Sequence, residues 1–238
     1  MPVFKLPKTC VFPEPDFSEP DGLLAYGGDL SVKRLLAAYS KGIFPWFSDN
    51  DPILWWSPDP RMVLYPKELK RHKSLRTLIR SNKFSVTFDT SFEAVIRKCA
   101  EVARTGQPDG TWITEEMIQA YLKLHQKGFA HSVETWYENQ LVGGLYGVSI
   151  GGMFFGESMF HLMSNASKVA LWHLVDLLLS WDFDLIDAQQ ETNHLRNMGG
   201  KLIGRKVFLH LLVQSTAKSS RIGNWSREVE GKTHVIER

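Results

Sequence analysis

The sequence contains only two cysteines and no long run of apolar residues. Cys10 and Cys99 lie far apart without CxxC spacing, so neither a disulfide framework nor a zinc ribbon is expected, and a reducing compartment fits. Prolines interrupt the N-terminal residues where a signal peptide would need an apolar stretch. No later segment has the length of a membrane span. We therefore expect a cytoplasmic protein that does not enter a membrane.

The motifs of common hydrolases, metalloenzymes and nucleotidases are also missing. The eight histidines form no HExxH or other metal-binding spacing, so no metal site is expected. There is no GxSxG, and no glycine-rich loop is followed by GK[ST]. The net charge of +2 over 238 residues does not by itself indicate a nucleic-acid partner, because a basic patch is a local property.

The N-terminal quarter of the chain is rich in proline and aromatic residues. SVKRLLAAYSKGIF predicts a helix with Ser31 as its N-cap. Residues 42–61 follow, with three of the eight tryptophans and four of the eleven prolines. The prolines exclude a continuous helix, and the apolar residues do not alternate as in a half-buried strand. This rigid segment either seals a core or presents flat rings to a ligand.

From residue 84 onward the pattern predicts a strand, two helices, three strands in a meander, a long helix, a strand, a short strand and a final helix. This order indicates an α+β domain with a mixed, mainly antiparallel sheet, as in acyltransferases of the N-acetyltransferase (GNAT) superfamily. We expect a small N-terminal α+β domain over residues 1–62 and a GNAT-like domain over residues 63–238. The tail after about residue 216 is expected to be partly flexible.

Two strand-like stretches carry polar side chains. In LIDAQQ, alternation would project Asp187 and Gln189 to one face, where the amide oxygen could accept a proton from an amine and the carboxylate could polarise the amide. The alternative is an aspartate that caps the next turn and a solvated glutamine. In MFFGESMF, Glu157 interrupts an apolar strand, so it either lines a wet cavity or meets water at a sheet edge. Strict alternation would place Glu157 and Met159 on one face and Phe154 on the other, unless Gly156 hosts a bulge.

Basic residues are concentrated between positions 67 and 83, where Glu68 is the only acid. They form either a solvated helix face or a surface that contacts nucleic-acid phosphates. Aromatic rings beside such a patch commonly hold single-stranded nucleic-acid ends, so the tryptophans of residues 42–61 are candidate stacking platforms as well as candidate core residues. The candidates for phosphate contact are Lys70, Lys73, Arg76, Arg80 and Lys83.

Several blocks between residues 12 and 212 resemble, in order, the bacterial leucyl/phenylalanyl-tRNA-protein transferases. They include EPDGLLAYGGDL, GIFPWFSDNDPILWWSPDPRMVL, GTWIT, FFGESMF, NASKVAL and LIDAQ. The resemblance implies an enzyme that moves leucine or phenylalanine, and less readily methionine, from aminoacyl-tRNA to proteins with N-terminal Arg or Lys. The added residue marks those proteins for N-end-rule degradation. The family needs no cofactor, and we expect a monomer.

The resemblance also implies three groups of site residues. The rings that stack on the terminal adenosine fall on Trp46 and Trp112. The catalytic glutamate, aspartate and glutamine fall on Glu157, Asp187 and Gln189. The apolar pocket for the aminoacyl side chain falls near Leu145, Phe154 and Met159, with help from the helix after Asn165. In that helix Trp172 and His173 depart from the family's plainer apolar pattern, which predicts an altered side-chain preference.

The implied chemistry is simple, because an aminoacyl ester is already activated and an amine can attack it without a serine or cysteine nucleophile. Two other functions stay open. An acetyl-CoA-dependent N-acetyltransferase would need a glycine-containing turn before the long helix, and FHLMSNASKVAL has no glycine. A non-catalytic RNA-binding module would use the basic helix and the rings, but it has no use for an Asp-Gln pair beside an apolar pocket.

Overall fold

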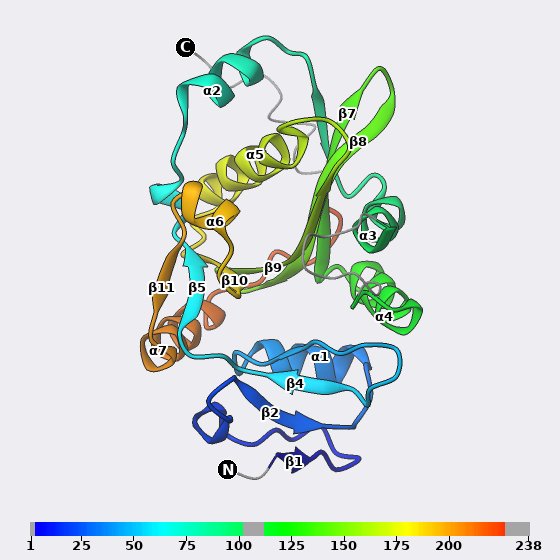
Figure 1. Ribbon diagram of the computed structural model, residues 1–238, viewed down its shortest axis with the longest axis vertical. Helices are drawn as coiled ribbons and strands as arrows, with labels where there is room; N and C mark the ends of the chain where they lie inside the picture. Colours follow the sequence, from blue (N-terminus) through cyan, green and yellow to red (C-terminus); the bar gives the residue numbers. More distant parts are fainter. Residues whose placement is uncertain (1–2, 102–111, 227–238) are drawn as a thin grey trace.

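The N-terminal part of the chain folds around a small sheet. In the computed structural model, which describes residues 3–101 and 112–226, four strands run in the order β1-β2-β4-β3 (Figure 1). Helix α1 (Val32–Tyr39) begins where the sequence predicts, because the Ser31 hydroxyl accepts a hydrogen bond from the backbone N–H of Arg34 at 3.4 Å. The strands are β1 (Phe4–Lys5), β2 (Leu23–Tyr26), β3 (Phe44–Pro45) and β4 (Leu54–Trp56), and the 3-10 helix η1 spans Pro15–Phe17.

The tryptophan-rich segment supplies two strands of this sheet. Trp55 is 0% exposed, and its indole N–H donates to the carbonyl oxygen of Gly27 at 2.8 Å. The indole N–H of Trp56 donates to the carbonyl oxygen of Trp46 at 2.6 Å, and the two ring centroids lie 5.4 Å apart. Trp55 therefore seals the core of the small domain, whereas Trp46 stays partly exposed beside Trp56.

The rest of the chain is built on a seven-stranded sheet in the order β11-β5-β10-β9-β8-β7-β6. The pair β9 and β10 is parallel and the other pairs are antiparallel. The predicted α+β fold with a mixed, mainly antiparallel sheet is thereby confirmed. The strands are β5 (Arg61–Leu64), β6 (Ser85–Phe88), β7 (Ala130–Tyr137), β8 (Gln140–Ile150), β9 (Met153–His161), β10 (Leu185–Gln189) and β11 (Lys201–Ile203).

Helices cover both faces of this sheet. Helix α5 lies on one face, between β5 and the β7–β8 hairpin, and α3 and α4 lie on the other (Figure 1). Helix α5 is apolar on nearly all sides, and it is accordingly buried on nearly all sides. The helices are η2 (Pro66–Glu68), α2 (Lys73–Arg80), α3 (Phe92–Glu101), α4 (Glu115–Gln126), α5 (Ala166–Ser180), α6 (Asn193–Asn197) and α7 (Arg205–Thr216).

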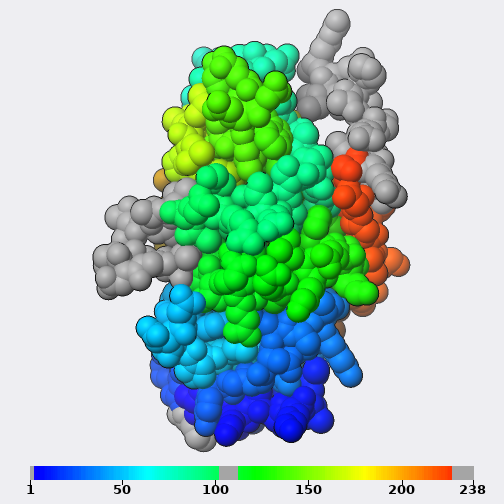
Figure 2. Space-filling view, turned by 90° about the vertical axis from the view of Figure 1, so that its right-hand side faces the viewer, coloured from blue at the N-terminus to red at the C-terminus, as the bar shows by residue number. Residues whose placement is uncertain are grey.

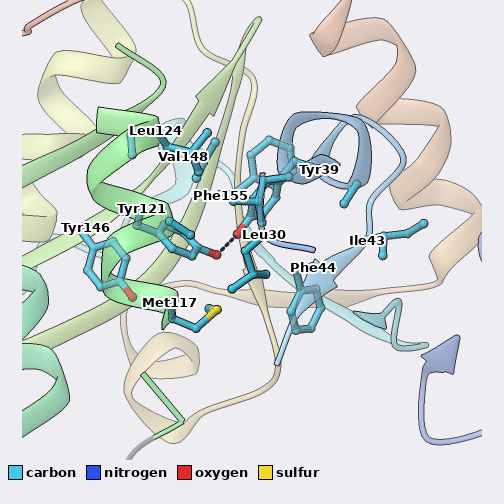
Figure 3. Packing of buried hydrophobic residues seen from close by; sticks show 14 of the residues in the cluster. Leu30, Tyr39, Ile43, Phe44, Met117, Tyr121, Leu124, Tyr146, Val148 and Phe155 are labelled. Carbon is cyan, nitrogen blue, oxygen red and sulfur yellow. Dashed lines mark hydrogen bonds between the residues drawn. The ribbon is translucent and has the colours of Figure 1, made fainter. Parts of the chain in front are cut away.

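The two domains share one apolar core. Tyr39 and Phe44 of the small domain belong to the same cluster of buried side chains as Tyr121 and Phe155 (Figure 3). In the space-filling view the small domain, in blue, is in direct contact with the green segments that include α4 (Figure 2). Strand β5 of the large sheet begins at Arg61, just before the expected boundary at residues 62–63.

Residues 217–226 return to the large sheet. Trp225 is 1% exposed, and its ring stacks on His131 with the centroids 3.6 Å apart. The backbone N–H of Trp225 donates to the carboxylate of Asp89 at 2.8 Å. This part of the expected flexible tail is therefore packed, and residues 227–238 lie outside the described residues. Within the described ranges, no helix is both long and apolar enough to cross a membrane.

Candidate active site

A cavity of about 590 Å³ lies between strands β8, β9 and β10 and helices α5 and α6. Leu145 of β8 and Phe154 and Met159 of β9 line it together, as expected from the sequence. Leu171 and Leu174 of α5 and Ile186 of β10 extend the apolar wall. Glu157 and Gln189 lie at the same cavity, so a carboxyl and an amide meet its apolar wall. The cavity can thus hold an apolar group next to polar side chains.

A bulge in β9 decides which side chains reach this cavity. Tyr146 pairs with Ser158 and Gly147 pairs with Gly156, so Glu157 has no partner in the ladder to β8. The parity of β9 changes at this residue. Phe154 and Met159, five positions apart, therefore both line the cavity. The strict alternation that would separate them is wrong, and the alternative of a bulge near Gly156 holds, with Glu157 as the extra residue.

Glu157 is buried in the centre of the sheet, so the interpretation as an edge residue meeting water is wrong. Its side chain accepts hydrogen bonds from the hydroxyl of Tyr39 at 2.7 Å, the hydroxyl of Tyr121 at 3.0 Å and the amide nitrogen of Gln189 at 3.0 Å. Burial raises the pKa of Glu157 to about 7, although the three hydrogen bonds act to lower it. The negative charge of Asp187 makes a smaller contribution in the same direction as burial, and it is included in this value. Glu157 can therefore gain or lose a proton near neutral pH.

The two tyrosines come from different domains. Tyr39 lies on α1 of the small domain and Tyr121 on α4, and their hydroxyls are hydrogen-bonded to each other (Figure 3). Burial and the nearby Glu157 raise the pKa of each tyrosine well above its ordinary value, so both stay protonated and can donate. No local pattern in the sequence marks these residues, because each also fits the apolar face of its helix.

A second bulge separates Asp187 from Gln189. The ladder between β10 and β5 shifts register between these two residues, so Ala188 is the extra residue. Gln189 lines the cavity, as do Ile186 and Ala188. Asp187 is 0% exposed and instead binds Arg61. The prediction that Asp187 and Gln189 share one face is therefore wrong, since it assumed a regular strand.

Gln189 has a backbone φ of +59°, in the left-handed region. This conformation costs a non-glycine residue about 1–3 kcal/mol, and the surrounding contacts must hold it. The backbone N–H of Gln189 donates to a carboxylate oxygen of Asp187 at 2.9 Å, and its side-chain nitrogen donates to Glu157. With the nitrogen so engaged, the amide is held in one orientation at the cavity wall.

The two tryptophans expected to bind adenosine do not line this cavity. Trp46 follows β3, and Trp112 precedes α4. Both are partly exposed and pack against the core cluster that contains Tyr39 and Tyr121. They therefore lie beside the same buried cluster as the two tyrosines that bind Glu157. Their contact with adenosine stays a prediction.

The five basic residues expected to contact phosphates are exposed on and around α2. Helix α2 lies at the end of the molecule opposite the small domain (Figure 1). A different basic group, which no sequence motif indicated, lines the cavity: His161, Lys168 and His194. Burial, followed by the charges of Lys168 and His161, lowers the pKa of His194. These three residues come from separate elements and meet only in the folded protein, so no spacing in the sequence indicates them.

Trp172 and His173 do not contribute to the cavity wall. Trp172 is 7% exposed, and the guanidinium of Arg71 lies 4.4 Å from its ring centroid. Helix α5 turns Leu171 and Leu174 toward the cavity instead. The presence of Trp172 and His173 therefore does not support an altered preference for the aminoacyl side chain. In the part of the chain that the structure describes, no group of three or more His, Cys, Asp or Glu side chains is arranged to hold a metal ion.

Comparisons with known proteins agree over nearly the whole chain. Residues 63–213 match the family model described as leucyl/phenylalanyl-tRNA protein transferase, and residues 28–59 match the model of its N-terminal domain. A protein named leucyl/phenylalanyl-tRNA-protein transferase from Syntrophobacter fumaroxidans is 55% identical over 228 residues, which cover 96% of this chain and 97% of the relative. One of the same name from Hydrogenovibrio crunogenus is 54% identical over 225 residues, covering 94% of this chain and 88% of the relative.

Among solved structures, a GCN5-related N-acetyltransferase from Kribbella flavida matches with a TM-score of 0.35 and 10% identity, covering 71% of this chain and 60% of that one. The sequence relatives are far closer, and both family models fall on the two domains seen in the fold. From these matches it follows that the chain belongs to the leucyl/phenylalanyl-tRNA protein transferase family.

Proposed function

We propose that this protein transfers leucine or phenylalanine, and less readily methionine, from aminoacyl-tRNA to the N-terminal Arg or Lys of acceptor proteins. It would act as a monomer in the bacterial cytoplasm, without a cofactor, and mark the acceptors for N-end-rule degradation. The observation that carries this proposal is the amide of Gln189, fixed on Glu157 at the wall of an apolar cavity.

The cavity suits the aminoacyl side chain. Its apolar wall of leucine, phenylalanine, methionine and isoleucine side chains favours an apolar group, and its volume of about 590 Å³ has room for leucine or phenylalanine. Shape in an apolar pocket discriminates weakly between such groups, which is why one site can accept all three amino acids.

The reaction is direct aminolysis of the ester. The α-amine nitrogen of the acceptor attacks the carbonyl carbon, a C–N bond forms, and the bond to the ribose oxygen of the terminal adenosine breaks. The proton lost by the amine ends on that oxygen, which leaves as a hydroxyl. The carbonyl oxygen of Gln189 accepts a hydrogen bond from the amine, and the carboxylate of Glu157 on the amide nitrogen strengthens this acceptor. Orientation of the two reactants can lower the barrier by about 7–11 kcal/mol.

The tRNA is bound outside this cavity. Trp46 and Trp112 stack on the terminal adenosine, next to the elements that carry Tyr39 and Tyr121. Lys70, Lys73, Arg76, Arg80 and Lys83 contact phosphates of the tRNA body, where their exposure leaves them accessible.

Incubation with labelled Leu-tRNA and a peptide beginning with Arg tests the function, with the same peptide beginning with Ala as control. We expect label in the Arg peptide alone. Absence of label in both peptides would contradict the transferase, and equal labelling would contradict only the rule for basic N-termini. A parallel incubation with labelled acetyl-CoA tests the N-acetyltransferase alternative, for which we expect no transfer.

A further inference from the structure

A buried ion pair lies directly behind Gln189. Arg61, the first residue of β5, is 1% exposed, and Asp187 of β10 is 0% exposed. The Nε atom of Arg61 donates to one carboxylate oxygen of Asp187 at 2.9 Å, and its Nη2 atom donates to the other at 2.7 Å. This two-point contact fixes both the position and the rotation of the carboxylate, which a single contact would not.

Two aromatic rings hold the guanidinium in place. Its central carbon lies 4.8 Å from the ring centroid of Phe44 and 4.6 Å from that of Phe208. Phe44 lies on β3 of the small domain, two residues before Trp46, and Phe208 lies on α7. Both rings are buried, at 5% and 0% exposed. The small domain and helix α7 thus both pack on one arginine, which favours a single rotamer of that side chain.

The fixed carboxylate in turn holds the backbone of Gln189. The oxygen of Asp187 that accepts from Nε of Arg61 also accepts the backbone N–H of Gln189 at 2.9 Å. This bond spans the bulge, where Gln189 takes its positive φ. Because the direction of the Gln189 side chain depends on that φ, the carboxylate helps to determine where the amide meets Glu157 and the cavity.

We propose that Arg61 is a positioning residue for transfer: through Asp187 it holds the backbone of Gln189 in the left-handed conformation that presents the amide to the reacting amine. Asp187 acts here through the main chain, since its oxygens are occupied by Arg61 and by the N–H of Gln189 and its side chain does not line the cavity. This inference rests on the proposed function. It adds that the small domain reaches the catalytic amide through Phe44 and Arg61.

The test is a double-mutant cycle between Arg61→Lys and Gln189→Ala, with kcat and KM measured for Leu-tRNA and an Arg-peptide. Lysine keeps the charge but cannot make the two-point contact. We expect Arg61→Lys to lower kcat roughly 10- to 100-fold with little change in KM, because small misplacements of a catalytic group have effects of this size. In the Gln189→Ala background the same change should lower kcat no further.

Arg34→Lys is the matched control. Arg34 is also fully buried and paired with an aspartate, Asp29, but it lies within the small domain. Its conversion should leave kcat unchanged. If Arg61→Lys melts too early to assay, the pair Arg61→Met with Asp187→Leu replaces it, because apolar groups of similar volume often substitute for a buried ion pair without loss of stability. That pair removes the acceptor of the Gln189 N–H and should reproduce the fall in kcat.

Equal effects of Arg61→Lys in both backgrounds would overturn the inference and leave the proposed function standing, since Arg61 would then act on stability alone. An unchanged kcat in Arg61→Lys would overturn it as well. If Gln189→Ala itself does not slow transfer, the catalytic role of the amide fails, and the positioning role of Arg61 fails with it. Retention of full kcat by the apolar pair would also contradict the role of Asp187.

Discussion

The carboxyl group of Glu157 should make the stability of this protein depend on pH. Burial raises its pKa from an ordinary value of 4.5 to about 7 in the folded state, so the folded protein holds this proton more tightly than the unfolded chain. The stabilisation from the bound proton is complete below about pH 4.5 and is lost as the pH rises through about 7. At about 1.4 kcal/mol for each pKa unit, the loss is on the order of 3 kcal/mol.

Replacement of Glu157 by Gln isolates this effect. The amide has nearly the shape of the carboxyl group but does not titrate between pH 5 and 8. Unfolding by denaturant at pH 5 and at pH 8 gives the free energy of unfolding for both proteins. His131, His173 and His194, whose pKa values are lowered by burial, also contribute to the pH dependence of stability, but they are common to both proteins. Their contribution cancels in the difference between variant and parent.

We expect the free energy of unfolding of the parent to fall by roughly 2–3 kcal/mol more than that of Glu157→Gln between pH 5 and pH 8, because only the parent carries the carboxyl group with the raised pKa. Parallel curves for the two proteins would refute the reasoning, because they would mean that Glu157 has the same pKa folded and unfolded. A larger fall in the variant would also refute it. The control Glu116→Gln, an exposed residue in the first turn of α4, should follow the parent at both pH values.

Three further predictions concern transfer and tRNA binding. Gln189→Ala should lower kcat by about 100-fold or more while filter binding of tRNA stays near that of the parent, and a large binding defect would point to a structural role. Trp46→Ala should weaken binding of a 3′-adenosine aminoacyl fragment by about 1–3 kcal/mol, measured by calorimetry. The control Trp136→Ala, at a half-buried tryptophan of β7, should not weaken it. Unchanged affinity in Trp46→Ala would mean that Trp46 only packs. Replacement of Lys73 and Arg76 by Glu should weaken binding of full-length tRNA at low salt. It should also reduce the slope of log binding constant against log salt concentration by about 1 for each phosphate that is no longer bound. An unchanged slope would mean that α2 is only a solvated face.

Local patterns were sufficient to predict most elements of the fold. The hydroxyl of Ser31 caps α1, and the apolar sequence of α5 matches a helix that is buried on nearly all sides. The three-strand meander and the strand LIDAQ lie where alternation and apolar runs predicted them. These features depend on contacts within a few residues, so a single sequence contains them. The pocket residues followed from resemblance to a family, and the cavity brings Leu145, Phe154 and Met159 together.

Tertiary structure decided which polar side chains meet. Regular alternation paired Asp187 with Gln189, but the bulges at Glu157 and Ala188 turn Gln189 toward Glu157 and leave Asp187 to Arg61. Arg61 lies 126 residues from Asp187 in the chain, and Tyr39 lies 118 residues from Glu157. Neither bulge has a local sequence signature as strong as a capping serine. Contacts between residues so far apart in the chain produce no regular spacing, so one sequence does not predict them. The sequence by itself therefore determined the elements and the residue types of the site. The packing of the two domains and of the seven-stranded sheet determined which of these side chains contact each other.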